Sequence, residues 1–175
     1  IDSVASALAA QAAGANRVEL CDNLAEGGTT PSLGMIRVLR ELLHIDLFIL
    51  IRPRGGDFIY SDTEFEVMKE DIRLAKSHGA DGIVAGVLKP DGSVDRDRTE
   101  ILLHLAKPMQ FTFHRAFDVC SNPMKALDDI IYIGCDRLLS SGQKPTAIEG
   151  AELLAQMIRR AGDSIRIMPG SGITE

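Results

Sequence analysis

Short apolar segments alternate along the chain with longer segments in which apolar residues recur every three or four positions. The short segments are typical of buried strands, and the longer period is typical of helices that pack one face against a sheet. Six such strands are predicted, beginning about 30 residues apart, which is the length of a strand, a crossover helix and two loops. They are Arg17–Cys21, Leu47–Ile51, Gly82–Ala85, Gln110–Phe113, Asp136–Leu139 and Ile165–Met168. The pattern predicts an α/β fold made of repeated strand–helix units.

One turn between a helix and the next strand is used three times. A Gly, a small apolar residue and an Asn or Asp come just before a strand in Gly14-Ala15-Asn16, Gly79-Ala80-Asp81 and Gly134-Cys135-Asp136. The Gly can adopt the left-handed conformation that ends a helix. The repeated sequence therefore predicts the same local geometry in three units.

Helix starts are marked by their own signals. Thr30-Pro31 and Asn122-Pro123 each predict an N-cap followed by Pro at the first helical position. Ser61 with Glu64 is typical of a capping box, in which a hydroxyl and a carboxylate each satisfy a free backbone N–H.

The spacing favours a closed barrel over an open doubly wound sheet. It is nearly constant, and no glycine-rich dinucleotide fingerprint follows the first strand. A (β/α)8 TIM barrel needs about 250 residues and eight strands. The 175 residues contain six predicted strands and, at Ile1-Asp2, the end of a seventh. We therefore expect residues 1–175 to form one barrel domain that is truncated at both ends. About seven of the eight units would be represented, with the first strand and the last unit largely missing.

Composition narrows the class of protein. The net charge of −6 argues against binding to nucleic acid or to an anionic membrane, because such proteins usually present a basic face. No apolar run approaches the roughly 18–20 residues that span a bilayer, and the first residues do not resemble a signal peptide. The three cysteines form neither a disulfide framework nor a CxxC pair. We expect a cytoplasmic protein with reduced thiols.

Residues that can carry chemistry follow the predicted strands, and in barrel enzymes the active site lies at the carboxyl ends of the strands. Val18 and Leu20 should face the helices, so Glu19 and Cys21 should face the barrel axis. A buried carboxylate needs a partner, and a structural ion-pair network is the alternative to a functional role for Glu19. The candidates are Glu19, Cys21, Arg52, Arg54, Asp57, His114, Arg115, Cys120 and the loop Gly170-Ser171-Gly172.

Six distinctive blocks of the sequence lie at or near the ends of the predicted strands. They are Arg17-Val18-Glu19-Leu20-Cys21, Glu26-Gly27-Gly28-Thr29-Thr30-Pro31-Ser32, Ile51-Arg52-Pro53-Arg54-Gly55-Gly56-Asp57-Phe58, Thr112-Phe113-His114-Arg115-Ala116-Phe117-Asp118, Leu139-Ser140-Ser141-Gly142 and Met168-Pro169-Gly170-Ser171-Gly172-Ile173-Thr174. These blocks resemble the CutC family of copper homeostasis proteins. The resemblance runs from Ile1 to Glu175, and it implies a TIM barrel, a role in copper homeostasis, self-association and relatives that are longer at both ends. Ser171 departs from the Gly or Ala that many relatives have there.

The resemblance implies that cuprous copper (Cu+) binds at the barrel mouth. Cuprous ion is soft and prefers thiolate and thioether ligands. Cys21 and Cys120 are the predicted ligands, and His114 and Met168 are available to complete the site. Cys135 belongs to a turn at the opposite end of the strands. The alternative for each thiol is a small buried hydrophobe.

An enzyme acting on a small phosphate- or carboxylate-bearing substrate in the same pocket is the second hypothesis. Arg52 and Arg54 would hold the anion in a fork of hydrogen bonds, beside Arg115, and Gly170-Ser171-Gly172 would form a cup of backbone N–H groups. His114 would act as general acid or base, with Glu19 or Asp57 as its complement. A third hypothesis is a regulatory or scaffold protein, in which all these polar groups are paired internally.

Overall fold

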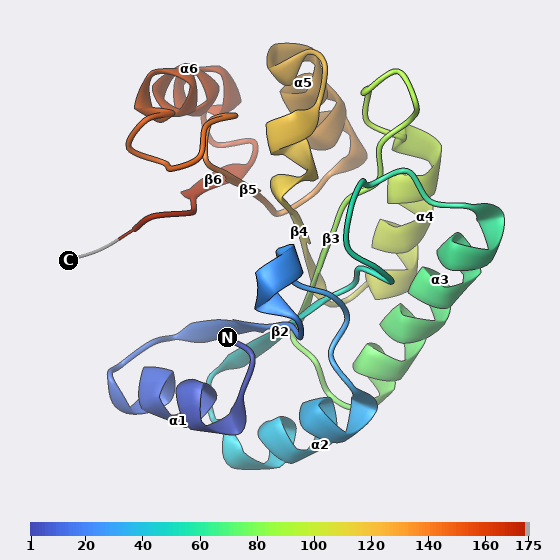
Figure 1. Cartoon of the computed structure of the whole chain (residues 1–175), viewed down its shortest axis with the longest axis vertical. Helices are drawn as coiled ribbons and strands as arrows, with labels where there is room; N and C mark the ends of the chain where they lie inside the picture. The colour runs from blue at the N-terminus through green and yellow to red at the C-terminus, as the bar shows by residue number, and fades with distance from the viewer. Residues whose placement is uncertain (174–175) are drawn as a thin grey trace. The chain divides into compact units, whose positions relative to one another are not determined.

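The computed structural model describes residues 1–173, in which strands and helices alternate along the chain (Figure 1). Thr174, the last residue of the motif after the sixth strand, lies outside the described residues. The chain divides into two compact units. The first contains Ile1–Gly56, Tyr60–Ala85 and His104–Gln110, and the second contains Asp57–Ile59, Gly86–Leu103 and the chain from Phe111 onward.

The first unit is a parallel three-stranded arrangement with its helices. Its strands β1, β2 and β3 pair in chain order, with Val18 opposite Leu47 and Phe48 opposite Gly82. Its core contains fully buried aliphatic side chains such as Leu39. The elements are α1 (Val4–Ala12), β1 (Arg17–Leu20), the 3-10 helix η1 (Leu24–Glu26), α2 (Leu33–Leu42), β2 (Asp46–Leu50), α3 (Asp62–Ser77) and β3 (Gly82–Ala85).

The second unit repeats this plan with β4, β5 and β6, again parallel and in chain order. Thr112 is opposite Arg137, and Leu138 is opposite Ile167. Gln110, the first residue of β4, belongs to the first unit, where its N–H donates to the Asp81 carbonyl at 3.1 Å. The elements are α4 (Arg96–Ala106, whose end is in the first unit), β4 (Gln110–Phe113), the 3-10 helix η2 (Arg115–Val119), α5 (Pro123–Ile133), β5 (Arg137–Ser140), α6 (Ala151–Ala161) and β6 (Arg166–Pro169).

The predicted α/β fold of parallel strand–helix units is confirmed, with strand ends shifted by one residue in four of the six strands. Residues 1–173 contain six strands, and among them Ile1-Asp2 is in no named strand, although Cys21 N–H donates to the Ile1 carbonyl at 2.9 Å. These described strands do not show a closed eight-stranded barrel. The incomplete TIM barrel and the single domain over residues 1–175 stay predictions.

The repeated turn has the geometry that its sequence predicted. Gly14, Gly79 and Gly134 have φ values of 88°, 79° and 88°. In two of the turns the Asp carboxylate accepts from the neighbouring strand: Asp81 from Leu47 N–H at 2.8 Å and Asp136 from Phe111 N–H at 2.7 Å. The turn therefore joins adjacent strands as well as ending a helix.

Two of the three predicted helix starts are confirmed. Asn122 caps α5 with Pro123 in its first turn, and Ser61 and Glu64 form the capping box of α3. Thr30 is not an N-cap. The helix begins later, because Ser32 accepts from Met35 N–H at 3.2 Å.

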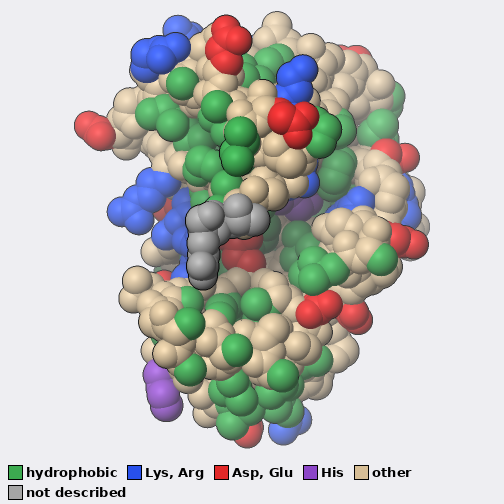
Figure 2. All heavy atoms as spheres, turned by 60° about the vertical axis from the view of Figure 1, so that its left-hand side comes forward, with side chains coloured by type: hydrophobic (Ala, Val, Ile, Leu, Met, Phe, Trp, Pro, Cys, Tyr) green, Lys and Arg blue, Asp and Glu red, His purple; other side chains and the backbone are tan. Residues whose placement is uncertain are grey.

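One face of the molecule carries side chains of every class. Figure 2 shows basic, acidic and apolar side chains interspersed over one face of the molecule. Exposed apolar side chains such as Tyr132 and Ile148 are ordinary features of a protein surface. Within residues 1–173, no helix combines the length and apolar character needed to cross a bilayer.

Candidate functional site

The candidate residues lie in both units. Glu19, Cys21, Arg52 and Arg54 belong to the first, and the remaining candidates belong to the second. Nearly all of them lie at the carboxyl end of a strand or in the loop that follows it. The fold therefore gathers polar chemistry at one end of the strands in each unit.

Arg52 is buried and holds a loop of its own chain. Only 5% of the residue is exposed, although it carries a guanidinium group. Its Nη1 donates to the carbonyls of Glu26 and Gly28, both at 2.8 Å, and its Nη2 donates to the carbonyl of Gly56 at 2.7 Å. The backbone N–H of Arg52 donates to Thr30 Oγ1 at 2.9 Å. Arg52 thus ties the loop after β1 to the loop after β2.

Arg54 is bound to a carboxylate on α3. Its Nε donates to Glu64 Oε1 at 2.6 Å, and its guanidinium lies 5.3 Å from the centre of the Tyr60 ring. The pKa of Glu64 is lowered by the N–H of Ser61 and by Arg54. Arg52 and Arg54 therefore bind different acceptors within the chain. The fork in which both would hold one anion stays a prediction.

Glu19 alternates along β1 with the buried Val18 and Leu20, and Cys21 follows the last residue of the strand. Val18 and Leu20 are 5% and 0% exposed, whereas the Glu19 side chain is 25% exposed and lies 3.6 Å from Arg17 Nη2. Cys21 is 9% exposed, and burial raises the pKa of its thiol. This cysteine lies against Gly28, where an added Cβ would come within 3.3 Å of the Cys21 Cβ.

In the second unit, His114 is held tightly at the end of β4. Its Nδ1 accepts from Ala116 N–H at 3.2 Å, so in the neutral ring the proton is assigned to Nε2. The Phe58 ring centre lies 5.0 Å away. At Gly86 an added Cβ would lie 2.7 Å from His114 Nδ1, so a larger residue there would displace the ring. His114 thus caps η2 through the nitrogen that a general base would use.

Asp118 is the centre of a buried network that the sequence did not predict. Its carboxylate accepts from Ser140 Oγ at 2.6 Å, from Ser141 N–H at 3.0 Å and from Gln143 N–H at 3.2 Å. Arg115 Nε donates to it at 2.7 Å. Burial alone would raise the pKa of Asp118, but these hydrogen bonds outweigh burial and the pKa is lowered. Arg115 and the loop after β5 are thus organised by an internal carboxylate.

Cys120 directly follows the 3-10 helix η2, and the side chain of Gln143 lies over it. The cysteine is 7% exposed, and burial raises the pKa of its thiol to about 11. Gln143 Nε2 donates to the Cys120 carbonyl at 2.8 Å and lies 3.4 Å from Cys120 Sγ. We did not predict Gln143 from the sequence, because a glutamine 23 residues from its partner carries no local motif.

The loop after β6 packs against the segment before α6. Gly170 N–H donates to the Ser140 carbonyl at 2.9 Å, and Ser171 Oγ donates to the Pro145 carbonyl at 2.7 Å. An added Cβ at Gly172 would lie 2.8 Å from Thr146 Cγ2. The cup of N–H groups at Gly170-Ser171-Gly172 stays a prediction, as does the role of Asp57, whose Oδ1 accepts from Ile59 N–H at 3.0 Å.

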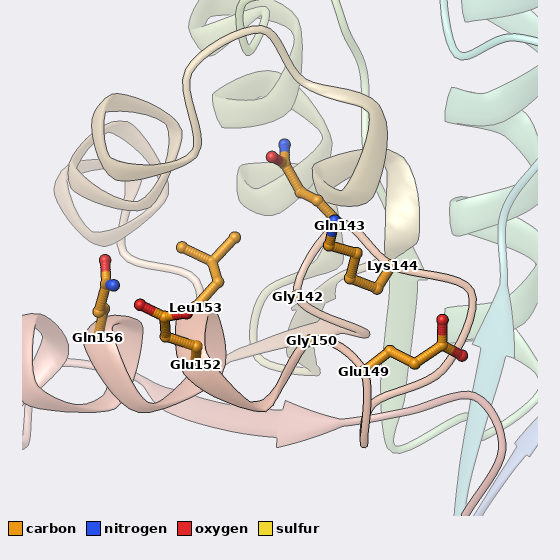
Figure 3. A pocket seen from close by; sticks show the side chains of 8 residues that line it. All are labelled: Gly142, Gln143, Lys144, Glu149, Gly150, Glu152, Leu153 and Gln156. Carbon is orange, nitrogen blue, oxygen red and sulfur yellow. The ribbon is translucent and has the colours of Figure 1, made fainter.

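A cavity of about 340 Å³ opens beside the loop after β5. Gln143, Lys144, Glu149, Glu152 and Gln156 contribute its polar side chains. In Figure 3 the Gln143 amide extends away from the α6 ribbon, whereas Leu153 and Gln156 project from that helix. Within the described part of the chain, no group of three or more His, Cys, Asp or Glu side chains is arranged to hold a metal ion.

Comparison with known proteins identifies relatives over the whole length of the chain. The model of the CutC family matches residues 1–175. The chain is 50% identical over 175 residues to the human "Copper homeostasis protein cutC homolog", covering all of this chain and 64% of the relative. It is 55% identical over 171 residues to a CutC family protein of Chromobacterium violaceum, covering 98% of this chain and 69% of the relative.

A solved structure is also similar. It is described as "the Putative Copper Homeostasis Protein CutC from Streptococcus agalactiae", with a TM-score of 0.87 and 39% identity. The match covers 91% of this chain and 79% of that one. The fold of the two units is therefore one already seen in a solved relative. The chain spans less than two thirds of the length of the human relative.

Proposed function

The chain belongs to the CutC family, and from this premise we propose that it serves copper homeostasis by binding cuprous ion as cargo in the cytoplasm. Cys21 in the first unit and Cys120 in the second are each proposed as a thiol that binds copper. The observation that carries this proposal is their position, because each thiol lies just beyond the carboxyl end of a strand or of the 3-10 helix that follows one. Cys135, by contrast, lies in the turn that precedes β5.

The kind of ligand favours cuprous ion. A soft ion prefers thiolate, and structural zinc usually takes four protein ligands.

Burial of the thiols has a consequence for binding. It raises the pKa of Cys21, and it raises that of Cys120 to about 11, so both thiols are protonated near neutral pH. Because a thiol must lose its proton to bind a metal, each ligand that binds releases one proton. In the pH range below the pKa of such a thiol, we expect the affinity for copper to increase with pH. Each thiol that binds should contribute up to about tenfold per pH unit.

The small-anion enzyme is the less supported alternative. An anion clamp needs guanidinium groups that can turn to a ligand, whereas Arg52 donates to three backbone carbonyls and Arg115 donates to Asp118. An anion would have to displace these acceptors, which are provided by the chain itself. The copper proposal requires no such rearrangement of the arginines.

The test is an anaerobic competition titration of cuprous ion against a chromogenic chelator. Wild type is compared with Cys21→Ser and Cys120→Ser, and Cys135→Ser is the matched control because it removes a buried thiol from the turn before β5. We expect each of the first two variants to lose at least about tenfold in affinity, which corresponds to about 1.4 kcal/mol. The control should titrate like wild type. Equal uptake by all four proteins would exclude thiol-bound copper.

Self-association, which the family resemblance implies, is part of the same proposal. Gel filtration at micromolar concentration is the direct test. Elution at the volume of a single chain would exclude a stable homo-oligomer.

A further inference from the structure

Gln143 lies over the Cys120 thiol. Its Nε2 contacts the cysteine twice, at 2.8 Å from the carbonyl oxygen and at 3.4 Å from the sulfur, and it also lies 3.4 Å from the Phe117 carbonyl. With this side chain in place, Cys120 is only 7% exposed. The amide is therefore part of what separates the sulfur from solvent.

The backbone of Gln143 is held in a conformation that suits few residues. Its φ is 59°, in the left-handed region that side chains other than Gly, Asn and Asp seldom adopt. The Gln143 N–H donates to Asp118 Oδ1 at 3.2 Å, and the preceding Gly142 N–H donates to Ser140 Oγ at 2.8 Å. The Asp118 network thus fixes the backbone from which the amide reaches Cys120.

The Gln143 side chain also has space into which it can move. It is partly exposed and lines the cavity of about 340 Å³ beside α6. Rotation of the Gln143 side chain requires that its Nε2 release the Cys120 carbonyl, to which it donates at 2.8 Å. The loop can therefore stay in place while the amide leaves the sulfur.

We propose that Gln143 is the positioning residue that controls access to Cys120: its amide covers the thiol and must rotate away before a ligand reaches the sulfur. The inference rests on the proposed role of Cys120 as a copper ligand, and it adds the step by which the cargo gains entry. Gln143 acts through Cys120 and is not itself a ligand.

Alkylation by iodoacetamide, a small uncharged thiol reagent, tests this step without copper. Site-resolved mass spectrometry follows Cys120 and Cys135 in the same sample. Gln143→Gly removes the amide while keeping a residue that tolerates the left-handed backbone, and Gln143→Asn keeps an amide that is one methylene too short. Gln156→Ala is the matched control, since Gln156 lines the same cavity from α6.

We expect Gln143→Gly to raise the alkylation rate of Cys120 about tenfold, the effect of losing about 1.4 kcal/mol of hydrogen bonding. Gln143→Asn should also react faster than wild type. Cys135 should keep its wild-type rate in every variant, and Gln156→Ala should leave Cys120 unchanged. A wild-type rate at Cys120 in a folded Gln143→Gly protein would overturn the proposal. Equal acceleration at Cys120 and Cys135 would also overturn it, because it would indicate general loosening.

The two proposals fail separately. If Cys120→Ser keeps its copper but Gln143→Gly accelerates alkylation, access is controlled by Gln143 and the copper role is wrong. If Cys120→Ser loses copper but the alkylation rate of Cys120 is the same in wild type and Gln143→Gly, Cys120 is a copper ligand and Gln143 does not control access to it.

Discussion

Replacement of Asp118 with alanine should destabilise the protein strongly, because one carboxylate organises the loop after β5. The Asp118 side chain is 7% exposed and accepts from Ser140 Oγ and from the backbone N–H groups of Ser141 and Gln143. Without the carboxylate these donors lose their shared acceptor. The perturbation therefore leaves polar groups unpaired in a mostly buried region.

The magnitude follows from those contacts. A hydrogen bond to a charged group contributes about 1.5–3 kcal/mol, and neighbouring contributions do not add in full. Arg115 also donates to Asp118 but is 43% exposed, so solvent screens its share. We expect a loss of about 3 kcal/mol, equivalent to a fall of roughly 6–12 °C in melting temperature for a chain of this size.

Thermal and urea unfolding, followed by circular dichroism, measure this loss. Asp128→Ala is the control, because Asp128 also pairs with an arginine, Arg160, at 2.9 Å but has a side chain that is 47% exposed. We expect little change in its melting temperature. A loss from Asp118→Ala no larger than that of the control would refute the reasoning.

The pH dependence gives an independent check on the charge of Asp118. Its folded-state pKa is lowered from 3.8, so its stabilisation is fully present above pH 3.8 and is lost as pH falls through the lower, folded value. The stability gap between wild type and Asp118→Asn should therefore be constant near neutral pH and should shrink in strong acid. A gap that persists unchanged in strong acid would indicate a loss of packing instead.

Two further predictions concern the first unit. Gly28→Ala should cost about 1–3 kcal/mol more than Gly14→Ala in thermal unfolding. Both glycines have positive φ, but only at Gly28 would the new Cβ meet neighbours, Leu50 Cδ2 at 2.7 Å and Cys21 Cβ at 3.3 Å. Equal losses of stability in the two variants would show that the loop can shift to accommodate the Cβ. Asp71→Asn should be more stable than wild type at pH 7, because burial raises the pKa of Asp71 and its ionised form opposes folding. The gain should vanish below the ordinary pKa of 3.8, and a gain that is the same at every pH would exclude this cause.

The regular elements were predictable because their signals are local. A strand–helix period and a Gly–small–Asp turn are read from residues that are neighbours in sequence, and their physical causes, backbone conformation and the burial of one face, act within a few residues. Strand boundaries shifted by one residue because pairing with the neighbouring strand decides where a strand ends. Thr30 was misassigned as a cap because Ser32, two residues later, reaches the free N–H of Met35.

The candidate residues were predicted to follow the strands, since parallel strands bring the residues after them to one end of a sheet. Their partners were not predicted. Arg52 suggested an anion clamp in the sequence, but in the fold its guanidinium binds the carbonyls of Glu26, Gly28 and Gly56. Which acceptor a long side chain reaches depends on loops that approach from elsewhere in the chain.

Local sequence was sufficient to predict the repeated strand–helix unit and to place polar residues after the strands. It gave no sign that Asp118 holds the loop after β5 or that Gln143 lies over Cys120. These contacts join residues 22 to 25 positions apart. A hydrogen bond forms only when donor and acceptor lie within a few ångströms of each other. Residues so far apart in sequence come that close only when one strand–helix segment packs against the next.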